Sequence, residues 1–161
     1  WSARGGIEAW GLLALLTEDP YYLEAIEEQF TAVSNDLPRN QYLTPSYLRG
    51  LSLVYDWTHS LVTPEQRERR AEVLCRLADY CRTIWRHNDF NNHFVAERMV
   101  VLYPGVVLHA DGYFPDKVNS YLEEGKDFLS IHQANWRNYK LPNLEGLDTS
   151  SNSQTKLFNS F

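Results

Sequence analysis

The sequence predicts an all-α protein built from pairs of helices. Apolar residues recur with a helical period along most of the chain, and no segment shows the two-residue alternation of a half-buried strand. Helices of two kinds also alternate, since a helix that is apolar on most faces is each time followed by an amphipathic one. This alternation is typical of αα-hairpin repeats, in which each pair buries its apolar face on the next pair.

The first pair is predicted over residues 7–16 and 20–33. The first helix is apolar nearly all round, so we expect it to be buried on every side. The second helix sets Leu23, Ile26 and Phe30 on one face and glutamates on the other. Pro20 follows Glu18 and Asp19, where proline suits the first position of a helix.

The second pair is predicted over residues 47–61 and 64–86, again an apolar helix followed by an amphipathic one. Thr63 and Gln66 have the spacing of a capping box, with Pro64 at the first helical position. Cys75 and Cys81 lie six positions apart in the amphipathic helix. The helical rise between them is about 9 Å, too far for a disulfide, so we expect two buried free thiols.

The third pair is predicted over residues 93–108 and 116–132, and Pro104 should kink the first of these helices or end its first half. Polar residues, proline and glycine dominate after Trp136. We therefore expect a helical domain over residues 1–136 and a polar loop or frayed C-terminal segment over 137–161. Three hairpins form about half of a closed six-hairpin (α/α) toroid, and an open helical array is the alternative.

Composition narrows the classes of partner. The 161 residues carry a net charge of −6, which leaves no broad basic face for nucleic acid or an anionic membrane. No apolar run approaches the roughly 20 residues that a membrane span needs. We expect no metal, because the two cysteines lack C-x-x-C spacing and because His93 and Glu97, four positions apart, have no third ligand at ligand spacing. We also expect no cofactor. The aromatic share of 14% suits a surface that stacks flat ligands such as sugars.

The segment from Asn88 to His93 places polar residues just before the third apolar helix. Asn91 or Asn92 can cap that helix, and its free N–H groups favour an anion such as a substrate carboxylate. The alternative is plain capping by asparagine, with His93 hydrogen-bonded in the interior.

Several short motifs resemble one enzyme family in their order and spacing: Arg4–Trp10, Leu13–Thr17, Leu53–Trp57 with Leu61, Thr63–Glu65 and Asn91–His93. Over about residues 4–136 the chain is similar to the α/α-toroid domain of heparinase II/III-like polysaccharide lyases, which include alginate lyases. In that family a β-sandwich domain follows the toroid, and nothing in this sequence encodes one. The resemblance thus implies further C-terminal domains of a longer chain, together with a secreted or periplasmic location.

The activity that the resemblance implies is β-elimination on an acidic polysaccharide or oligosaccharide. The family's Asn-His pair, which neutralises the uronate carboxylate, corresponds to Asn92 and His93. Donors at a helix N-terminus suit this role, because they stabilise charge that develops in the transition state. The family's acid–base tyrosine stands further along, where residues 144–158 contain none, and Tyr139 is the nearest tyrosine upstream.

Further side chains are candidates for substrate binding: Arg4, Trp10, Tyr55, Trp57, Asn91, Arg98 and Trp136. The alternatives are ion pairing of the arginines with Glu8 or Glu97 and packing of the aromatic rings. Asp56 is interpreted as a structural acceptor rather than a groove residue. Two further classes of function remain open, a non-catalytic carbohydrate-binding module and a helical-repeat interaction module.

Overall fold

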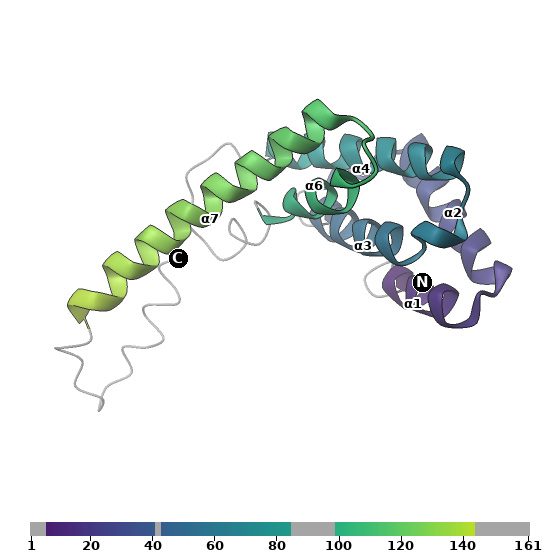
Figure 1. Ribbon diagram of the computed structural model, residues 1–161, viewed down its shortest axis with the longest axis horizontal. Coiled ribbons are helices and arrows are strands. Elements are labelled where there is room, and N and C mark those ends of the chain that lie inside the picture. Colours follow the sequence, from purple (N-terminus) through teal and green to yellow (C-terminus); the bar gives the residue numbers. More distant parts are fainter. Residues whose placement is uncertain (1–5, 41–42, 85–98, 144–161) are drawn as a thin grey trace.

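The computed structural model describes residues 6–40, 43–84 and 99–143. These residues form six α-helices and one 3₁₀ turn and contain no strand, which confirms the all-α prediction for this part of the chain. The elements are α1 (Gly6–Thr17), α2 (Pro20–Asn35), α3 (Leu43–Trp57), η1 (His59–Leu61), α4 (Pro64–Ile84), α6 (Leu102–His109) and α7 (Pro115–Asn143) (Figure 1).

Helix α3 occupies the middle of the described helices. It packs against α1, α4 and α6, while α1 also packs on α2 and α6 on α7. Figure 1 shows α1, α3 and α6 in one row, with α2, α4 and α7 in a second row along it. Helix α4 contacts α2 and α7, so the second row is continuous as well.

The helix starts follow the capping signals of the sequence. The Asp19 carboxylate accepts a hydrogen bond from the Tyr21 N–H at 2.9 Å, with Pro20 in the first turn of α2. The predicted capping box is confirmed, because the Thr63 N–H donates to Gln66 Oε1 at 2.9 Å and the Gln66 N–H donates to Thr63 Oγ1 at 3.3 Å. The chain thus enters both amphipathic helices at the predicted residues.

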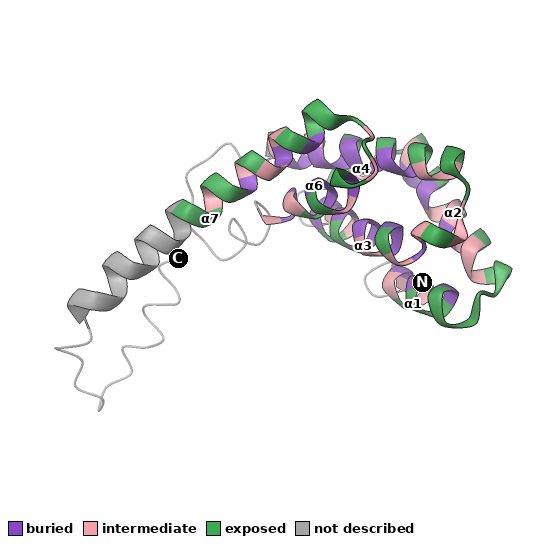
Figure 2. Cartoon of the chain, in the orientation of Figure 1, coloured by how far each residue is buried: buried purple, intermediate pink, exposed green. Residues whose placement is uncertain are grey.

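The core gathers around α3 and α4. Leu48, Leu51 and Val54 of α3 expose no surface, and neither do Leu74 and Leu77 of α4. Figure 2 shows buried residues along both helices. Helix α3, which the sequence predicts to be apolar on most faces, is therefore buried on most of its faces. The free thiols of α4 are buried, as predicted.

Glycine lets helices approach closely, both between neighbouring pairs and within one pair. A Cβ on Gly11 of α1 would lie 2.7 Å from Val54 Cγ2 of α3. Between α6 and α7 the arrangement is reciprocal, since Leu122 fills the space beside Gly105 and Leu102 fills the space beside Gly125. A side chain of one helix thus packs into the space left by a glycine of the other.

The expectation that α1 is buried on every side is wrong. Only Ile7, Gly11 and Ala14 are buried, on the face toward the neighbouring helices. Four leucines on the remaining faces are exposed: Leu12, Leu13, Leu15 and Leu16. The sequence period identifies side chains that favour burial, but burial also needs a neighbour, and the described chain supplies one on a single side of α1.

The third pair also differs from its predicted bounds. Residues 100 and 101 form a turn and α6 begins at Leu102, so the segment predicted as one helix is broken just before Pro104. Pro104 lies in the first turn of α6, where its missing N–H costs no helical hydrogen bond. Helix α7 continues to Asn143, so the polar segment predicted to begin at residue 137 starts as helix. Residues 144–161 lie outside the described part.

Candidate functional site

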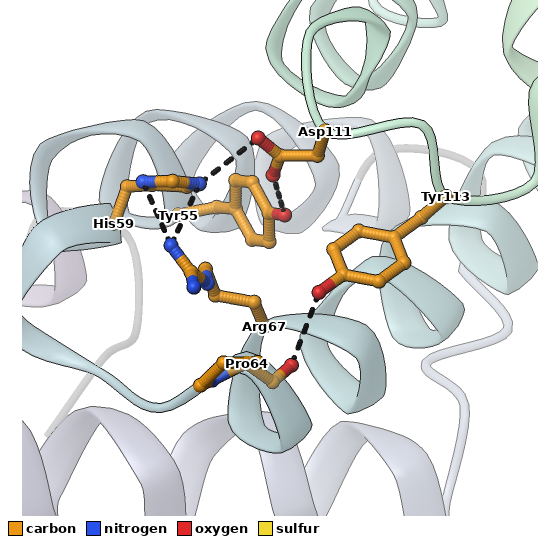
Figure 3. A network of polar contacts seen from close by, with 6 residues as sticks. All are labelled: Tyr55, His59, Pro64, Arg67, Asp111 and Tyr113. Atoms are coloured by element: carbon orange, nitrogen blue, oxygen red, sulfur yellow. Dashed lines mark hydrogen bonds and ion pairs between the residues drawn. The ribbon is translucent and has the colours of Figure 1, made fainter.

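One connected polar cluster of the described residues lies where the turn after α6 meets α3. Asp111 follows α6, and Gly112 with φ of +72° reverses the chain directly after it. The Tyr55 hydroxyl of α3 donates to Asp111 Oδ2, and His59 Nε2 of η1 lies 2.9 Å from Asp111 Oδ1 (Figure 3). One carboxylate therefore accepts hydrogen bonds from two side chains of the preceding helix pair.

The contact with Asp111 assigns the tautomer of His59. Because Nε2 must carry the hydrogen that it donates to the carboxylate, Nδ1 of the neutral ring has the free lone pair. Arg67 Nη1 lies 3.4 Å from both Nδ1 and Nε2, so the guanidinium sits against the imidazole ring (Figure 3). His59 and Asp111 are residue types that form acid–base dyads in enzymes, but here their contact holds the imidazole ring in place.

Burial decides the state of the tyrosine in this cluster. The Tyr55 side chain is 1% exposed, and burial, reinforced by the Asp111 carboxylate, raises the pKa of Tyr55 far above its ordinary value. The phenol therefore stays protonated and donates. Tyr113 adds a link to the next helix, since its hydroxyl donates to the Pro64 carbonyl at 3.2 Å (Figure 3). Together these contacts hold the turn between α6 and α7 against α3 and α4.

A second polar cluster is centred on Arg70 of α4, whose side chain is 1% exposed. Its Nε donates to Glu27 Oε1 of α2 at 2.7 Å, and its Nη1 donates to Thr58 Oγ1 at the end of α3 at 2.7 Å. Nη2 lies 2.5 Å from the same Glu27 oxygen, a charge contact without the geometry of a hydrogen bond. The guanidinium also lies over the Phe30 ring, 5.0 Å from its centroid.

A hollow of about 210 Å³ between α2 and α4 borders this cluster. Its charged lining is balanced, since Arg69 and Arg70 face Glu27 and Glu72. The opposite charges of the lining cancel, so the hollow has no net charge with which to select an ionic ligand. Arg70 Nη2 is buried and has no hydrogen-bond partner among the described residues.

Several predicted site residues lie outside the described part: Arg4, Asn91, Asn92, His93 and Arg98. Trp136 and Tyr139 belong to α7, and their side chains are also outside it. The roles predicted for these residues stay predictions. The interpretation that Arg4 pairs with Glu8 is likewise untested, and Arg49 Nη2 lies 3.8 Å from Glu8 Oε1.

The described aromatic candidates pack between helices rather than at an open surface. Trp10 packs partly buried against the core, and Trp57 lies close to Gly11 where α3 meets α1. The Tyr55 hydroxyl donates a hydrogen bond to Asp111. Asp56 is exposed, and no hydrogen bond or ion pair joins it to another described residue. Among these residues the carboxylate that anchors a neighbouring segment is Asp111.

Sequence reasoning missed His59, Arg67 and Asp111 as a group. They are separated by up to 52 positions along the chain, and each one alone is a common residue at a turn or helix start. The available signal is the run Ala110, Asp111 and Gly112 between the two predicted helices of the third pair, since Asp and Gly favour a turn. Such a run predicts a helix boundary but not a contact point.

Neither a metal centre nor a membrane span emerges from the described residues. Within residues 6–40, 43–84 and 99–143, no three His, Cys, Asp or Glu side chains gather as metal ligands would. Among the same residues, every helix is too short or too polar to cross a bilayer.

No protein-family model, curated protein or solved structure matches this chain.

Proposed function

We propose that this chain is the helical portion of a polysaccharide lyase-like protein, built from αα-hairpins that form part of an (α/α) toroid. The observation that carries the proposal is the order of helix contacts, with α1 on α3 on α6 in one row and α2, α4 and α7 in the other. Each pair is closed by a short connection, Glu18–Asp19, Thr58–Thr63 and Ala110–Phe114. Successive pairs stacked in this way are what the toroid of the resembled family requires.

The proposed reaction is β-elimination on a uronate-containing glycan. Asn92 and His93 neutralise the uronate carboxylate, so that the charge left after removal of the neighbouring proton is stabilised. Tyr139 is the candidate acid or base, and aromatic and arginine side chains such as Trp136 and Arg98 bind neighbouring sugars. Further domains of a longer protein, in a secreted or periplasmic location, complete the active form.

The test measures the ultraviolet absorbance of the unsaturated uronate that β-elimination produces. The chain and any longer form that contains it are incubated with alginate, heparan-type and other uronate polysaccharides. We expect His93→Ala to abolish the gain in absorbance. His109→Ala is the matched control, because His109 is exposed at the end of α6 and should leave the rate unchanged. No absorbance gain on any uronate would reject the lyase proposal.

A second candidate function is a helical-repeat interaction module, which the four exposed leucines of α1 favour. This module predicts that uronate oligosaccharides leave the melting temperature unchanged, whereas a glycan-binding protein is stabilised by its ligand. A shift of the melting temperature without β-elimination would instead indicate a non-catalytic carbohydrate-binding module.

A further inference from the structure

The hollow of about 210 Å³ between α2 and α4 has an apolar inner side and a polar rim. Phe30 and Val73, which are 3% and 5% exposed, supply the apolar inner side. The side chains at the rim are polar or charged and exposed: Thr31 and Asn35 of α2, and Arg69 and Glu72 of α4. Apolar walls with a few polar groups around them are typical of small-molecule sites.

The ion pair of Glu27 with Arg70 fixes a carboxylate in the lining of this hollow. Glu27 Oε1 makes both contacts to the guanidinium, at 2.7 Å to Nε and 2.5 Å to Nη2. Within the part of the chain that the structure describes, Oε2 has no hydrogen-bond donor, and the Glu27 side chain is 27% exposed. The carboxylate therefore keeps one accessible oxygen, held in place by a buried arginine and ready to accept a hydroxyl group.

The rim supplies donors as well as acceptors. Neither the Arg69 guanidinium nor the Asn35 amide forms a side-chain hydrogen bond with another described residue. The guanidinium only donates, while the amide and the Thr31 hydroxyl both donate and accept. The lining thus matches a ligand whose polar groups also do both.

Charge and size narrow the class of ligand further. Two arginines and two glutamates line the hollow, so a ligand with a net charge is repelled by one pair as it is attracted by the other. Pockets for drug-sized ligands measure roughly 300–1,000 Å³, and this hollow is smaller. A neutral sugar ring has the required size, hydroxyl groups at its edge and CH groups on its face.

We propose that the hollow between α2 and α4 binds one neutral sugar ring, as a free monosaccharide or as the terminal residue of a neutral glycan. Its CH face packs on Phe30 and Val73, and one hydroxyl group donates to Glu27 Oε2. Other hydroxyl groups accept hydrogen bonds from Arg69 and Asn35. The proposal does not depend on the proposed lyase activity, because a neutral sugar has no uronate carboxylate and is not a substrate for that reaction.

The experiment is an NMR titration of the unmodified chain, with the backbone amide signals of α2 and α4 as the readout. The probes are glucose, galactose and mannose, their methyl glycosides, and the disaccharides maltose and lactose. We expect at least one neutral sugar to cause saturable shifts around the hollow. Equal affinity for the methyl glycoside would assign the terminal residue of a glycan as the ligand, and weaker affinity for it would assign the free sugar.

Charged sugars test the argument from charge. Glucuronate and, at about pH 6, protonated glucosamine should bind more weakly than glucose, because each meets like charge in the lining. Tighter binding of either one than of every neutral sugar would overturn the proposal, and so would the absence of saturable shifts with all neutral probes.

The location is tested by filling the hollow. Thr31→Trp should raise the dissociation constant by about tenfold or more, without removing any contact of Arg70. Ala32→Trp is the matched control, since Ala32 is exposed on α2 but does not line the hollow, and its affinity should equal that of the unmodified chain. Circular dichroism checks that both variants fold. Unchanged affinity of a folded Thr31→Trp would place the sugar elsewhere and overturn the proposal.

Discussion

Helices α1 and α3 have similar sequences in one respect, since both are apolar on most faces, yet they have different environments. Helix α3 has neighbours in α1, α4 and α6, and its Leu48, Leu51 and Val54 are fully buried. Among the described helices α1 packs mainly against α2 and α3, and Leu16 stays 70% exposed. The difference teaches that an apolar pattern predicts where burial is favourable, while the number of neighbouring helices sets how much burial occurs.

The largest expected effect compares equal truncations in the two helices. Leu51→Ala should lower the free energy of unfolding by about 2–5 kcal/mol, because it leaves a cavity in a closely packed site. Leu16→Ala should change it by less than about 0.5 kcal/mol, since an exposed side chain loses little burial. Urea unfolding followed by circular dichroism measures both, at concentrations where the chain is monomeric. Equal losses would mean that α1 is covered in solution.

Removing the polar contacts of Arg70 at the end of α3 should have the next largest effect on the free energy of unfolding. Arg70→Ala removes the ion pair with Glu27 and the hydrogen bond to Thr58, and it should cost about 3 kcal/mol. The loss includes the penalty of leaving partly buried partners without their donor. Arg69→Ala, at the exposed neighbouring position, serves as the control and should be nearly neutral. Similar unfolding midpoints for the two variants would contradict the buried role of Arg70.

A smaller effect is expected where α1 meets α3. Gly11→Ala places a methyl group 2.7 Å from the fully buried Val54, and the overpacking should cost about 1–3 kcal/mol, partly offset by the better helix propensity of alanine. Gly6→Ala is the matched control, because nothing lies within 4 Å of its added Cβ. Thermal unfolding of both variants checks this, and a stabilised Gly11→Ala would show that the two helices are less closely packed.

The smallest expected effect is on the pH dependence of stability, through a thiol at the contact between α4 and α7. Burial raises the pKa of the Cys75 thiol from 9.0 to about 11, with Asp79 and Glu72 adding to the rise, while the Tyr121 hydroxyl and Lys117 oppose it. Because the folded pKa is the higher one, the stabilisation is complete well below pH 9 and is lost as pH rises toward about 11. The loss should reach about 0.4 kcal/mol at pH 9.

Cys75→Ala tests this pH dependence, because it removes the titrating thiol from the contact between α4 and α7. Its free energy of unfolding should fall less steeply between pH 8 and 10 than that of the unmodified chain, measured by urea unfolding at each pH. Identical slopes would show that the thiol titrates alike in the folded and unfolded chains.

Local features of the fold could be predicted from the sequence, without knowledge of any tertiary contact. The capping box of Thr63 and Gln66 and the cap at Asp19 depend on residues within three positions of one another, so spacing alone places them. The buried thiols follow from the helical period of α4 in the same way. The break before Pro104 was expected because a helix interior does not tolerate a missing donor.

The candidate site was less accessible, because its members are brought together only by packing. Tyr55 was predicted as a substrate-binding residue because of its aromatic ring. In the structure its hydroxyl is a buried donor to Asp111, 56 positions away along the chain. His59 and Arg67 have no distinctive local pattern. Their roles depend on the α6–α7 turn lying against α3, which no periodicity encodes.

The order of the residues specifies the helices, their caps and the side chains that favour an apolar environment, since each depends on hydrogen bonds and periods that span a few positions. Packing alone selects which of those apolar faces receive a neighbour and which distant polar groups meet. Helix α1 and Asp111 illustrate both outcomes, because the environment of a side chain is a property of every segment that surrounds it, and segments far apart along the chain supply most of that environment.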